Sequence, residues 1–506
     1  MAFRTVVILI LGLVCSPVRA GSPFGRNVPR VCIADGCMHG SWMRSLHGER
    51  YEAFVGVPFA KPPVGALRFA NPVPNDPWTE AELDASGRNP RAPCMQQNLF
   101  LPERGVEGKE DCLYLNVYRP VRKKKDEKVN STTESLPTLV YIHGGGYLAG
   151  YNSPLVAGAE KLMDHPVIVV TIAYRLGAFG FLSTGDDAAS GNYGLKDQRL
   201  ALRWVHRNIG AFGGDPQLVT IVGHSAGGAS VHLQLMDPGN EGLFQRAISL
   251  SGNALTSWSA PRTHPEELAR RQAEFVAIKD SQRMNTSALV EALRGVEAEL
   301  FVSSYKEFTD TDCSKETFVQ QKTLLLNVLG GAKHSNAFPL LMERFFGNDS
   351  TIEDCFRKEH VNTLTEVFNE ALFLYPLTLS IRQHAQHART KAPVFLYMFN
   401  YKGPYSYSSV FAPDDDKSQD FGIVHCDELL YLLRAPILFP DFRRNTPDAH
   451  VTRKFTDLIV EFARTGVAPK DIERAGDFPR TLELVNSNST VEPLEQSELN
   501  VLCYIS

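Results

Sequence analysis

Five residues in the middle of the chain, Gly223-His224-Ser225-Ala226-Gly227, constrain its fold more than any other feature. They match G-x-S-x-G, a pattern in which a strand turns sharply into a helix and exposes the serine hydroxyl at the turn. The flanks fit this setting, because 218–222 predicts a buried strand and 228–236 predicts a helix. Small neighbours let the chain pass through the strained turn. The motif therefore predicts that Ser225 is a nucleophile.

The segments around this motif alternate between strands and helices. Residues 138–142 and 167–173 are short and rich in β-branched side chains, which is typical of buried parallel strands. Apolar residues recur at helical spacing over 195–212 and again over 451–464, and 393–399 predicts a further strand. This alternation predicts an α/β fold with a central, mostly parallel sheet flanked by helices.

A glycine-rich segment, 143–146, follows an earlier predicted strand. A tetrahedral oxyanion needs backbone N–H donors that approach it without Cβ atoms in the way. Gly145 and Gly146 can supply two such donors and Ala226 a third. A serine hydroxyl also needs a base, which follows the nucleophile in chain order in folds built on this motif. His425, which follows an apolar strand and a polar loop, is the candidate base.

The N-terminus predicts export. Arg4 precedes the apolar run 6–14, and Val18 and Ala20 fit the small-residue cleavage rule, so 1–20 is expected to be a signal peptide. The run is too short to span a bilayer comfortably, so no stable membrane insertion is expected. One of the nine cysteines lies in this signal, and an even number remains for an oxidising compartment. Sequons predict glycosylation at Asn130, Asn285, Asn348 and Asn488.

The charge of the chain argues against nucleic acid as a partner. The net charge is -5 and the isoelectric point is near 6.3, whereas proteins that bind nucleic acid present a basic surface. The one break in composition, 121–136, is rich in charged residues, serine and threonine. Acidic residues interrupt its lysines, so the segment predicts a solvated surface loop.

Further motifs lie at 51–60, 62–63, 67–69, 110–117, 191–199, 212–216 and 251–258. Together they resemble the type-B carboxylesterase family, which includes the cholinesterases, over nearly the whole mature chain. The motif at 251–258 is most similar to secreted insect β-esterases. The resemblance implies one domain over 21–506 with the α/β-hydrolase fold, in which a helical lid and a C-terminal region pack on the sheet.

The resemblance also implies roles for individual residues. Trp258 would line the acyl pocket, Tyr147 would lie beside the oxyanion glycines, and a disulfide between Cys94 and Cys112 would close a loop at the rim of the active-site gorge. Further residues would have structural roles: the ion pairs Arg68–Glu110 and Arg175–Asp197, and Asp427 and Glu428 after the base.

The chain departs from the family pattern where the acid of the catalytic triad is expected. Relatives carry an apolar strand and then a turn that bears a glutamate, but here several tens of residues are missing near 308–315. Glu316 precedes His425 by 109 residues, close to the family's usual gap, and is the expected acid. Asp312 is the next candidate. A splice form, an error in the gene model and genuine divergence would each produce this shortening.

The residues and the resemblance together predict a secreted serine carboxylesterase that acts through an acyl-serine intermediate. Small-molecule esters are the expected partners, and no cofactor or metal is expected. A catalytically impaired, cholinesterase-like adhesion or binding protein is an alternative, but the retained Ser225 and His425 favour an enzyme. A juvenile-hormone esterase is a narrower alternative, although its relatives tend to carry glutamine where this chain has His224.

Overall fold

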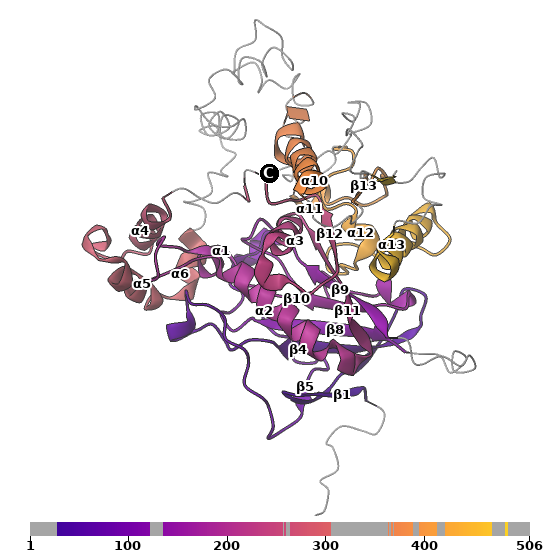
Figure 1. Ribbon diagram of the computed structural model, residues 1–506, viewed down its shortest axis with the longest axis horizontal. Helices are drawn as coiled ribbons and strands as arrows, with labels where there is room; N and C mark the ends of the chain where they lie inside the picture. The colour runs from indigo at the N-terminus through magenta and orange to yellow at the C-terminus, as the bar shows by residue number, and fades with distance from the viewer. Residues whose placement is uncertain are drawn as a thin grey trace, which may run out of the picture.

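A seven-stranded sheet lies at the centre of the molecule (Figure 1). Its strand order is β12-β11-β9-β10-β8-β4-β3. The structure, a computed structural model, describes residues 28–121, 135–256, 258–259, 264–304, 363, 366–367, 369–387, 394–411, 420–467 and 481–483. Within these ranges no helix is both long enough and apolar enough to cross a membrane.

The sheet combines a parallel half with an antiparallel half. The parallel strands are β9 (Leu136–Ile142), β10 (Ile168–Ile172), β11 (Gly214–His224) and β12 (Arg246–Leu250). The antiparallel strands are β3 (Ser41–Arg44), β4 (Arg50–Pro58) and β8 (Tyr114–Pro120). The α/β fold and the three predicted parallel strands are confirmed. Strands β3 and β4 run antiparallel because the short turn between them cannot make a parallel crossover.

Helices supply the crossovers between parallel strands. Helix α2 (Tyr193–Asn208) precedes β11, and α3 (Ala226–Met236) joins β11 to β12. The predicted helix over 195–212 is thus α2, followed by one 3₁₀ turn at Ile209–Phe212. The predicted C-terminal helix is α13 (Pro447–Thr465), whose N-cap Thr446 accepts a bond from Ala449.

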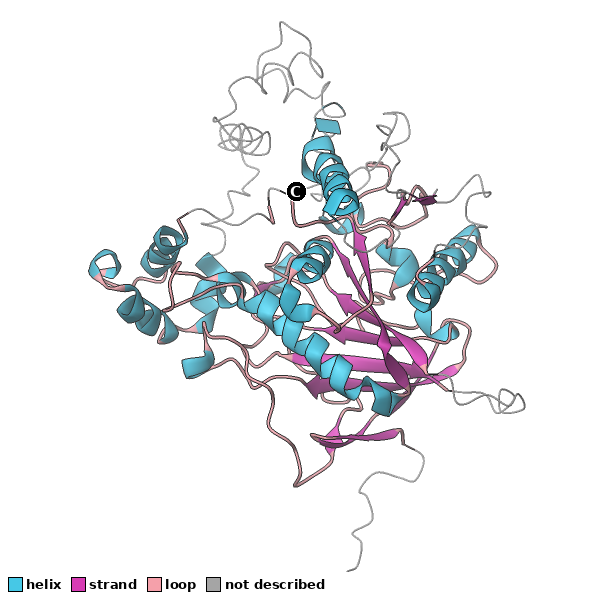
Figure 2. Ribbon diagram, in the orientation of Figure 1, coloured by secondary structure: helices cyan, strands magenta, loops and turns pink. Residues whose placement is uncertain are grey.

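Alternation along each strand gives the sheet two buried faces. On β9, Val140 and Ile142 pack in one core with Leu202 and Val205 of α2. Their neighbours Leu139 and Tyr141 pack in a second core with α13. Because successive strand residues point to opposite faces, one short apolar run serves both cores. Figure 2 shows helices on both sides of the sheet.

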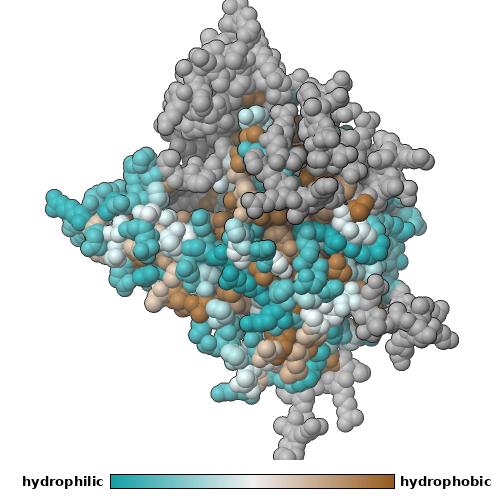
Figure 3. Space-filling view, in the orientation of Figure 1, coloured by the Kyte–Doolittle hydropathy of each residue, from teal (hydrophilic) through white to brown (hydrophobic). Residues whose placement is uncertain are grey.

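The remaining helices form a lobe beside the sheet and a C-terminal layer. The lobe consists of α1 (Gly177–Phe181), α4 (Pro265–Phe275), α5 (Thr286–Arg294) and α6 (Ala298–Ser303), which share a third core. Its α4–α5 part projects to the left in Figure 1, and its surface in Figure 3 is mostly hydrophilic. The C-terminal layer contains α10 (Tyr375–His387), α11 (Ser408–Phe411), α12 (Leu429–Leu432) and α13.

Smaller elements complete the described part of the chain. The predicted strand at 393–399 forms β13 (Phe395–Tyr397), which pairs with β14 (Thr481–Glu483) outside the central sheet. Two more small sheets contain β1 (Arg30–Ile33), β2 (Gly36–His39) and β5 (Leu83–Asp84), and β6 (Gln96–Gln97) and β7 (Val106–Glu107). Short 3₁₀ helices lie at Gly65–Leu67, Pro102–Arg104, Leu162–Asp164, Pro238–Asn240 and Ser281–Arg283. A short π-helix lies at Glu370–Leu374.

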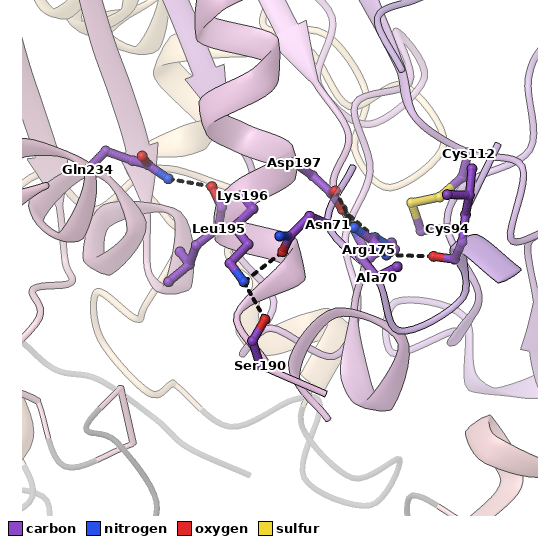
Figure 4. A network of polar contacts seen from close by, with 11 residues as sticks. Ala70, Asn71, Cys94, Cys112, Arg175, Ser190, Leu195, Lys196, Asp197 and Gln234 are labelled. Carbon is purple, nitrogen blue, oxygen red and sulfur yellow. Dashed lines mark hydrogen bonds and ion pairs between the residues drawn. A yellow bond between two sulfur atoms is a disulfide. The ribbon is translucent and has the colours of Figure 1, made fainter. Parts of the chain in front are cut away.

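Two buried arginines, Arg68 and Arg175, connect segments that are distant in the sequence, and Figure 4 shows the contacts of Arg175. Arg175 binds Asp197 of α2 through Nη2 at 2.7 Å and Nε at 2.8 Å, and it also donates to the Ala70 carbonyl. Arg68 pairs with Glu110 and donates to the Arg294 carbonyl at the end of α5. Both predicted ion pairs are therefore present, and each gives a buried charge its partner.

Candidate active site

Ser225 occupies a strained turn between β11 and α3. Its φ of 56° and ψ of −122° are unusual for a residue with a side chain. The Ser225 amide donates to the Leu250 carbonyl at 2.9 Å, which ties the turn to β12. The side chain is half-buried. The backbone therefore holds Ser225 in the conformation that its motif predicts.

Glycines allow other backbone segments to approach this turn closely. A Cβ atom on Gly227 would lie 2.1 Å from the Ile142 carbonyl oxygen, and one on Gly223 would lie 2.3 Å from the Gly227 oxygen. Both distances are far below van der Waals contact. A Cβ on Gly252 would lie 2.0 Å from the Ser225 carbonyl oxygen. The sequence gives no signal for this contact of Gly252, because Ser225 lies on a different segment of the chain.

The predicted oxyanion donors lie on two segments that meet at this turn. A Cβ on Gly144 would lie 3.0 Å from the Ser225 Cβ, so the glycine-rich segment passes directly beside the serine. Gly145 and Gly146 follow with φ of 103° and 63°, and both are accessible at the surface. Ala226 is the first residue of α3, whose first amides have no partner within the helix. This arrangement can present several N–H groups to one oxygen atom.

Side chains and backbone contacts anchor the glycine-rich segment. Gln96 accepts from the Gly150 amide at 2.7 Å and donates to the Gly150 and Cys94 carbonyls. Cys94 in turn forms a disulfide with Cys112. The Tyr147 carbonyl accepts from the Gly177 amide at 2.8 Å. Sequence analysis missed Gln96, whose only local signal is a polar residue close to a cysteine.

His143, at the start of the segment, is buried and stacks on Tyr174, with ring centroids 4.4 Å apart. The Tyr174 hydroxyl donates to the His143 carbonyl at 2.9 Å. Burial lowers the pKa of His143 to about 4, so its ring is neutral at physiological pH. A neutral, stacked ring packs the base of the oxyanion segment without a buried charge.

His425 lies on a loop against the end of β11. Its ring centroid is 4.4 Å from that of His224, the residue before Ser225, and 5.6 Å from that of Phe373. The structure therefore brings the predicted base and the predicted nucleophile to the same end of β11. Desolvation lowers the pKa of His425 to about 4. The neutral imidazole that results is the form that can accept a proton.

Asp427 fixes the loop that carries His425. Its carboxylate accepts from the Tyr407 amide at 2.8 Å and from the Val424 amide at 3.0 Å. Burial raises its pKa to about 6. Cys426, which lies between His425 and Asp427 in the sequence, has a φ of 81°. The structural role expected for Asp427 agrees with these bonds.

Behind His425 lies a cluster that sequence analysis did not foresee. The Cys426 sulfur is 3.8 Å from Nδ1 of His224. Nε2 of the same ring is 3.2 Å from Oε1 of Glu428, without the angles of a hydrogen bond. Burial raises the pKa of Glu428 to about 8 and holds the pKa of His224 well below its usual value. Both the His224 ring and the Glu428 carboxyl group are therefore neutral at physiological pH, and their contact is not an ion pair.

Donor atoms of His224, His425 and Cys426 all lie within 4.8 Å of one another. Among the described residues, this is the one group of three histidine, cysteine or acidic side chains close enough to hold a metal ion. The sequence could not indicate it, because His224 and Cys426 are 202 residues apart.

The segment expected to line the acyl pocket lies close to the oxyanion segment. Ser259, next to the half-buried Trp258, has its Oγ 3.5 Å from the Tyr147 hydroxyl. The Tyr147 ring also contacts Phe181, with centroids 5.0 Å apart. Tyr147 thus connects the oxyanion glycines to the Trp258 segment.

Several predicted positions lie outside the described residues. They are the signal peptide 1–20, the candidate acids Asp312 and Glu316, and the sequons at Asn130, Asn348 and Asn488. The fourth sequon, Asn285, is described and exposed. Its Oδ1 accepts from the Ala288 amide at 2.8 Å and caps α5.

Three comparisons with known proteins agree with one another. A sequence profile described as "Carboxylesterase family" matches residues 27–327 and 314–492. A juvenile hormone esterase of Tribolium castaneum is 34% identical over 87% of this chain and 84% of its own length. Esterase E4 of Myzus persicae is 29% identical over 94% of each chain. The crystal structure of a juvenile hormone esterase from Manduca sexta, with OTFP covalently attached, superposes with a TM-score of 0.68 at 25% identity, over 88% of this chain and 92% of that one.

Proposed function

We propose that this chain, which belongs to the carboxylesterase family and is a carboxylic ester hydrolase, acts through Ser225 and an acyl-serine intermediate. One observation carries the proposal. Ser225 lies in a strained turn, at the N-terminus of α3, directly beside the glycine-rich segment 143–146. In acyl transfer, such an arrangement exposes the nucleophile and places N–H donors where the oxyanion of the tetrahedral intermediate forms.

His425 is the proposed general base. It takes the proton of the Ser225 hydroxyl as the oxygen attacks the ester carbonyl, and it then gives the proton to the leaving alcohol. Gly145, Gly146 and Ala226 donate N–H bonds to the oxyanion. In the second half, His425 deprotonates water, which attacks the acyl-serine and releases the acid. Trp258 would line the pocket for the acyl group.

Glu316 is the proposed triad acid, on a segment that is shortened relative to the family near 308–315. The family profile matches in two separate parts that overlap at 314–327, which supports a break in the family pattern at this place. A carboxylate there would orient His425 and stabilise its protonated form. The residues before Glu316 are too polar to predict a buried strand, and we therefore propose that catalysis is weakened relative to relatives that keep this strand.

The protein is also proposed to be secreted and glycosylated. The N-terminal pattern of 1–20 supports a signal peptide. Disulfides Cys32–Cys37 and Cys94–Cys112 suit an oxidising compartment. Asn285, exposed on the hydrophilic lobe, is an accessible glycosylation site.

Hydrolysis of a short-chain aryl ester by the purified, secreted protein tests the proposed function. We expect a burst of aryl alcohol followed by a slower steady rate if deacylation limits turnover, and covalent labelling of Ser225 by an organophosphate. An active protein in which the organophosphate labels another residue would overturn the mechanism. An inactive protein would favour the alternative, a cholinesterase-like binding or adhesion protein.

A juvenile-hormone esterase is the second candidate, favoured by the two similar proteins that carry that name. His224, where such relatives tend to have glutamine, argues against it. Direct comparison of kcat/KM for juvenile hormone and for a short aryl acetate distinguishes the candidates. A clear preference for the hormone would support the narrower assignment, and a preference for the acetate would support a general carboxylesterase.

A further inference from the structure

We propose that His224, His425 and Cys426 form a binding site for a zinc ion that inhibits the enzyme. The three donors come from two elements, the end of β11 and the loop before α12, so they meet only in the folded protein. Two imidazoles and one thiolate are ligands that zinc prefers. The inhibition rests on the proposed function of His425, whereas the binding itself does not.

The distances suit a tetrahedral ion. Zinc–sulfur bonds of about 2.3 Å and zinc–nitrogen bonds of about 2.0 Å place two such ligand atoms roughly 3.5 Å apart. The Cys426 sulfur and Nδ1 of His224 are 3.8 Å apart, and all three donor atoms lie within 4.8 Å of one another. Small side-chain rotations would therefore bring them to one ion. A water molecule could fill the fourth position.

The backbone aims the thiol at the two rings. Cys426 has a positive φ of 81°, and Asp427 fixes the loop through the Val424 and Tyr407 amides. His224 is buried at the end of a central strand. The site is thus built from residues that are already held in place, which lowers the ordering cost of binding.

Glu428 completes an arrangement that is typical of zinc sites. A histidine that binds zinc through one nitrogen usually has a carboxylate or carbonyl group at the other, which orients the ring. In His224, Nδ1 faces Cys426, while Nε2 lies 3.2 Å from Oε1 of the buried Glu428. Neither Nε2 nor Oε1 has a hydrogen-bond partner in the described part of the protein. Glu428 is therefore assigned as a positioning residue for the zinc ligand.

Zinc at this site would stop catalysis. Coordination uses the ring lone pair of His425 that must accept the serine proton. If the ion binds the other ring nitrogen, it takes the position where the triad acid must bind. The thiol proton of Cys426 passes to solvent when the thiolate coordinates. No bond to substrate is involved, so a chelator should reverse the effect.

Titration of the full-length, glycosylated protein with Zn²⁺ and Co²⁺ tests the site by two readouts. We expect Zn²⁺ to abolish aryl ester hydrolysis and EDTA to restore it. We expect Co²⁺ to give a thiolate-to-metal charge-transfer absorption with one ion per chain. Cys426→Ser and His224→Gln should each weaken Zn²⁺ inhibition by at least about 10-fold, and Glu428→Gln by roughly 10-fold. The inhibition of each variant is expressed relative to the hydrolysis rate of that same variant without Zn²⁺.

His47→Asn is the matched control, because His47 is an exposed histidine outside the cluster. Its Zn²⁺ response should equal that of the unaltered protein. Melting temperatures identify misfolded variants, and Cys426→Ala replaces Cys426→Ser if the serine variant fails to fold. Zn²⁺ inhibition that persists without Cys426, or a Co²⁺ complex without the charge-transfer band, overturns the proposal. A charge-transfer band in a protein that hydrolyses no ester supports the metal site and contradicts the proposed function.

Discussion

At the scale of single residues, Ser225 is the position on which the chemistry depends. Its backbone is strained, and three glycines (Gly223, Gly227 and Gly252) make room for it. Strain of this kind costs roughly 1–3 kcal/mol and persists where the surrounding structure enforces it. A side chain in such a position is a good candidate for function.

Replacing Ser225 by alanine should lower kcat by about 10⁴-fold or more, because nucleophile and base act as a unit. Alanine removes one oxygen atom, so the melting temperature should change little. Initial rates on an aryl ester, together with organophosphate labelling, measure the effect. Labelling that persists in Ser225→Ala would contradict the assignment.

Glu316→Gln tests the acid. Glutamine cannot hold His425 in the correct tautomer, a change that costs about 10⁴-fold in a well-formed triad. We expect a smaller fall here, of at least about 10²-fold in kcat, because the residues before Glu316 are too polar to predict the buried strand that holds the acid firmly in a well-formed triad. Asp312→Asn is the matched control and should retain activity. A large fall in kcat for Asp312→Asn, with little change for Glu316→Gln, would identify Asp312 as the triad acid in place of Glu316.

At the scale of elements, the strand–turn–helix unit could be predicted well. Short β-branched runs and a helical period specify β9, β10, β11, α2, α3 and α13 locally. Strand pairing was less predictable, because an apolar run does not specify its neighbour. This is why the antiparallel half of the sheet and the β13–β14 pair are seen only in the structure.

In the candidate site, too, the residues within local motifs could be predicted and those that depend on long-range contacts could not. Ser225, the oxyanion glycines and His425 belong to motifs that lie within short stretches of sequence. The cluster of His224, Cys426 and Glu428 depends on contacts over some 200 residues, which one sequence cannot indicate. Gln96 and Gly252 likewise act on segments distant from their own.

The N-terminus of α5 allows capping and glycosylation to be separated. Asn285 caps the helix and is also a sequon asparagine. Asn285→Ala should remove the glycan and cost about 1 kcal/mol in unfolding free energy through the lost cap. Ser287→Ala should remove the glycan and keep the cap.

Mass spectrometry of the two variants before glycosidase treatment and urea unfolding of both after glycosidase treatment measure these effects. We expect both variants to lack the glycan and only Asn285→Ala to be destabilised. Equal stability of the two variants would show that the cap contributes nothing.

At the scale of the whole molecule, disulfide Cys94–Cys112 should contribute more to stability than Cys32–Cys37. The two bonds join residues 18 and 5 positions apart. In the chain-entropy model, closing these loops contributes about 3 and about 2 kcal/mol respectively. Urea unfolding of the two double alanine variants measures the difference, and peptide mapping without reduction checks the pairing. A larger loss from the Cys32–Cys37 variant would contradict the entropic account.

Acid should destabilise the fold through His143. Burial keeps its folded-state pKa at about 4, whereas the unfolded chain titrates near 6.5. Between these values the unfolded state binds the extra proton. Stability is therefore retained above about pH 6.5 and falls by up to about 3 kcal/mol as the pH drops to 4.

The measurement is the unfolding free energy in urea at pH 7, 5.5 and 4, compared with His143→Asn. The variant should be less stable at pH 7, because it loses the stacking on Tyr174, but its stability should depend less steeply on pH. Parallel pH curves for the two proteins would exclude His143 as the source.

The two-faced sheet has a consequence for the order in which the protein is made. Strands β9, β10 and β11 leave the ribosome early, but α13, which packs in the same core as Leu139 and Val222, follows more than 200 residues later. At roughly 5–20 residues per second, this apolar face stays uncovered for at least about ten seconds of translation. During that interval the exposed face is prone to aggregation and is a surface that chaperones bind, and a ribosome that stops before Pro447 releases a polypeptide that lacks this helix.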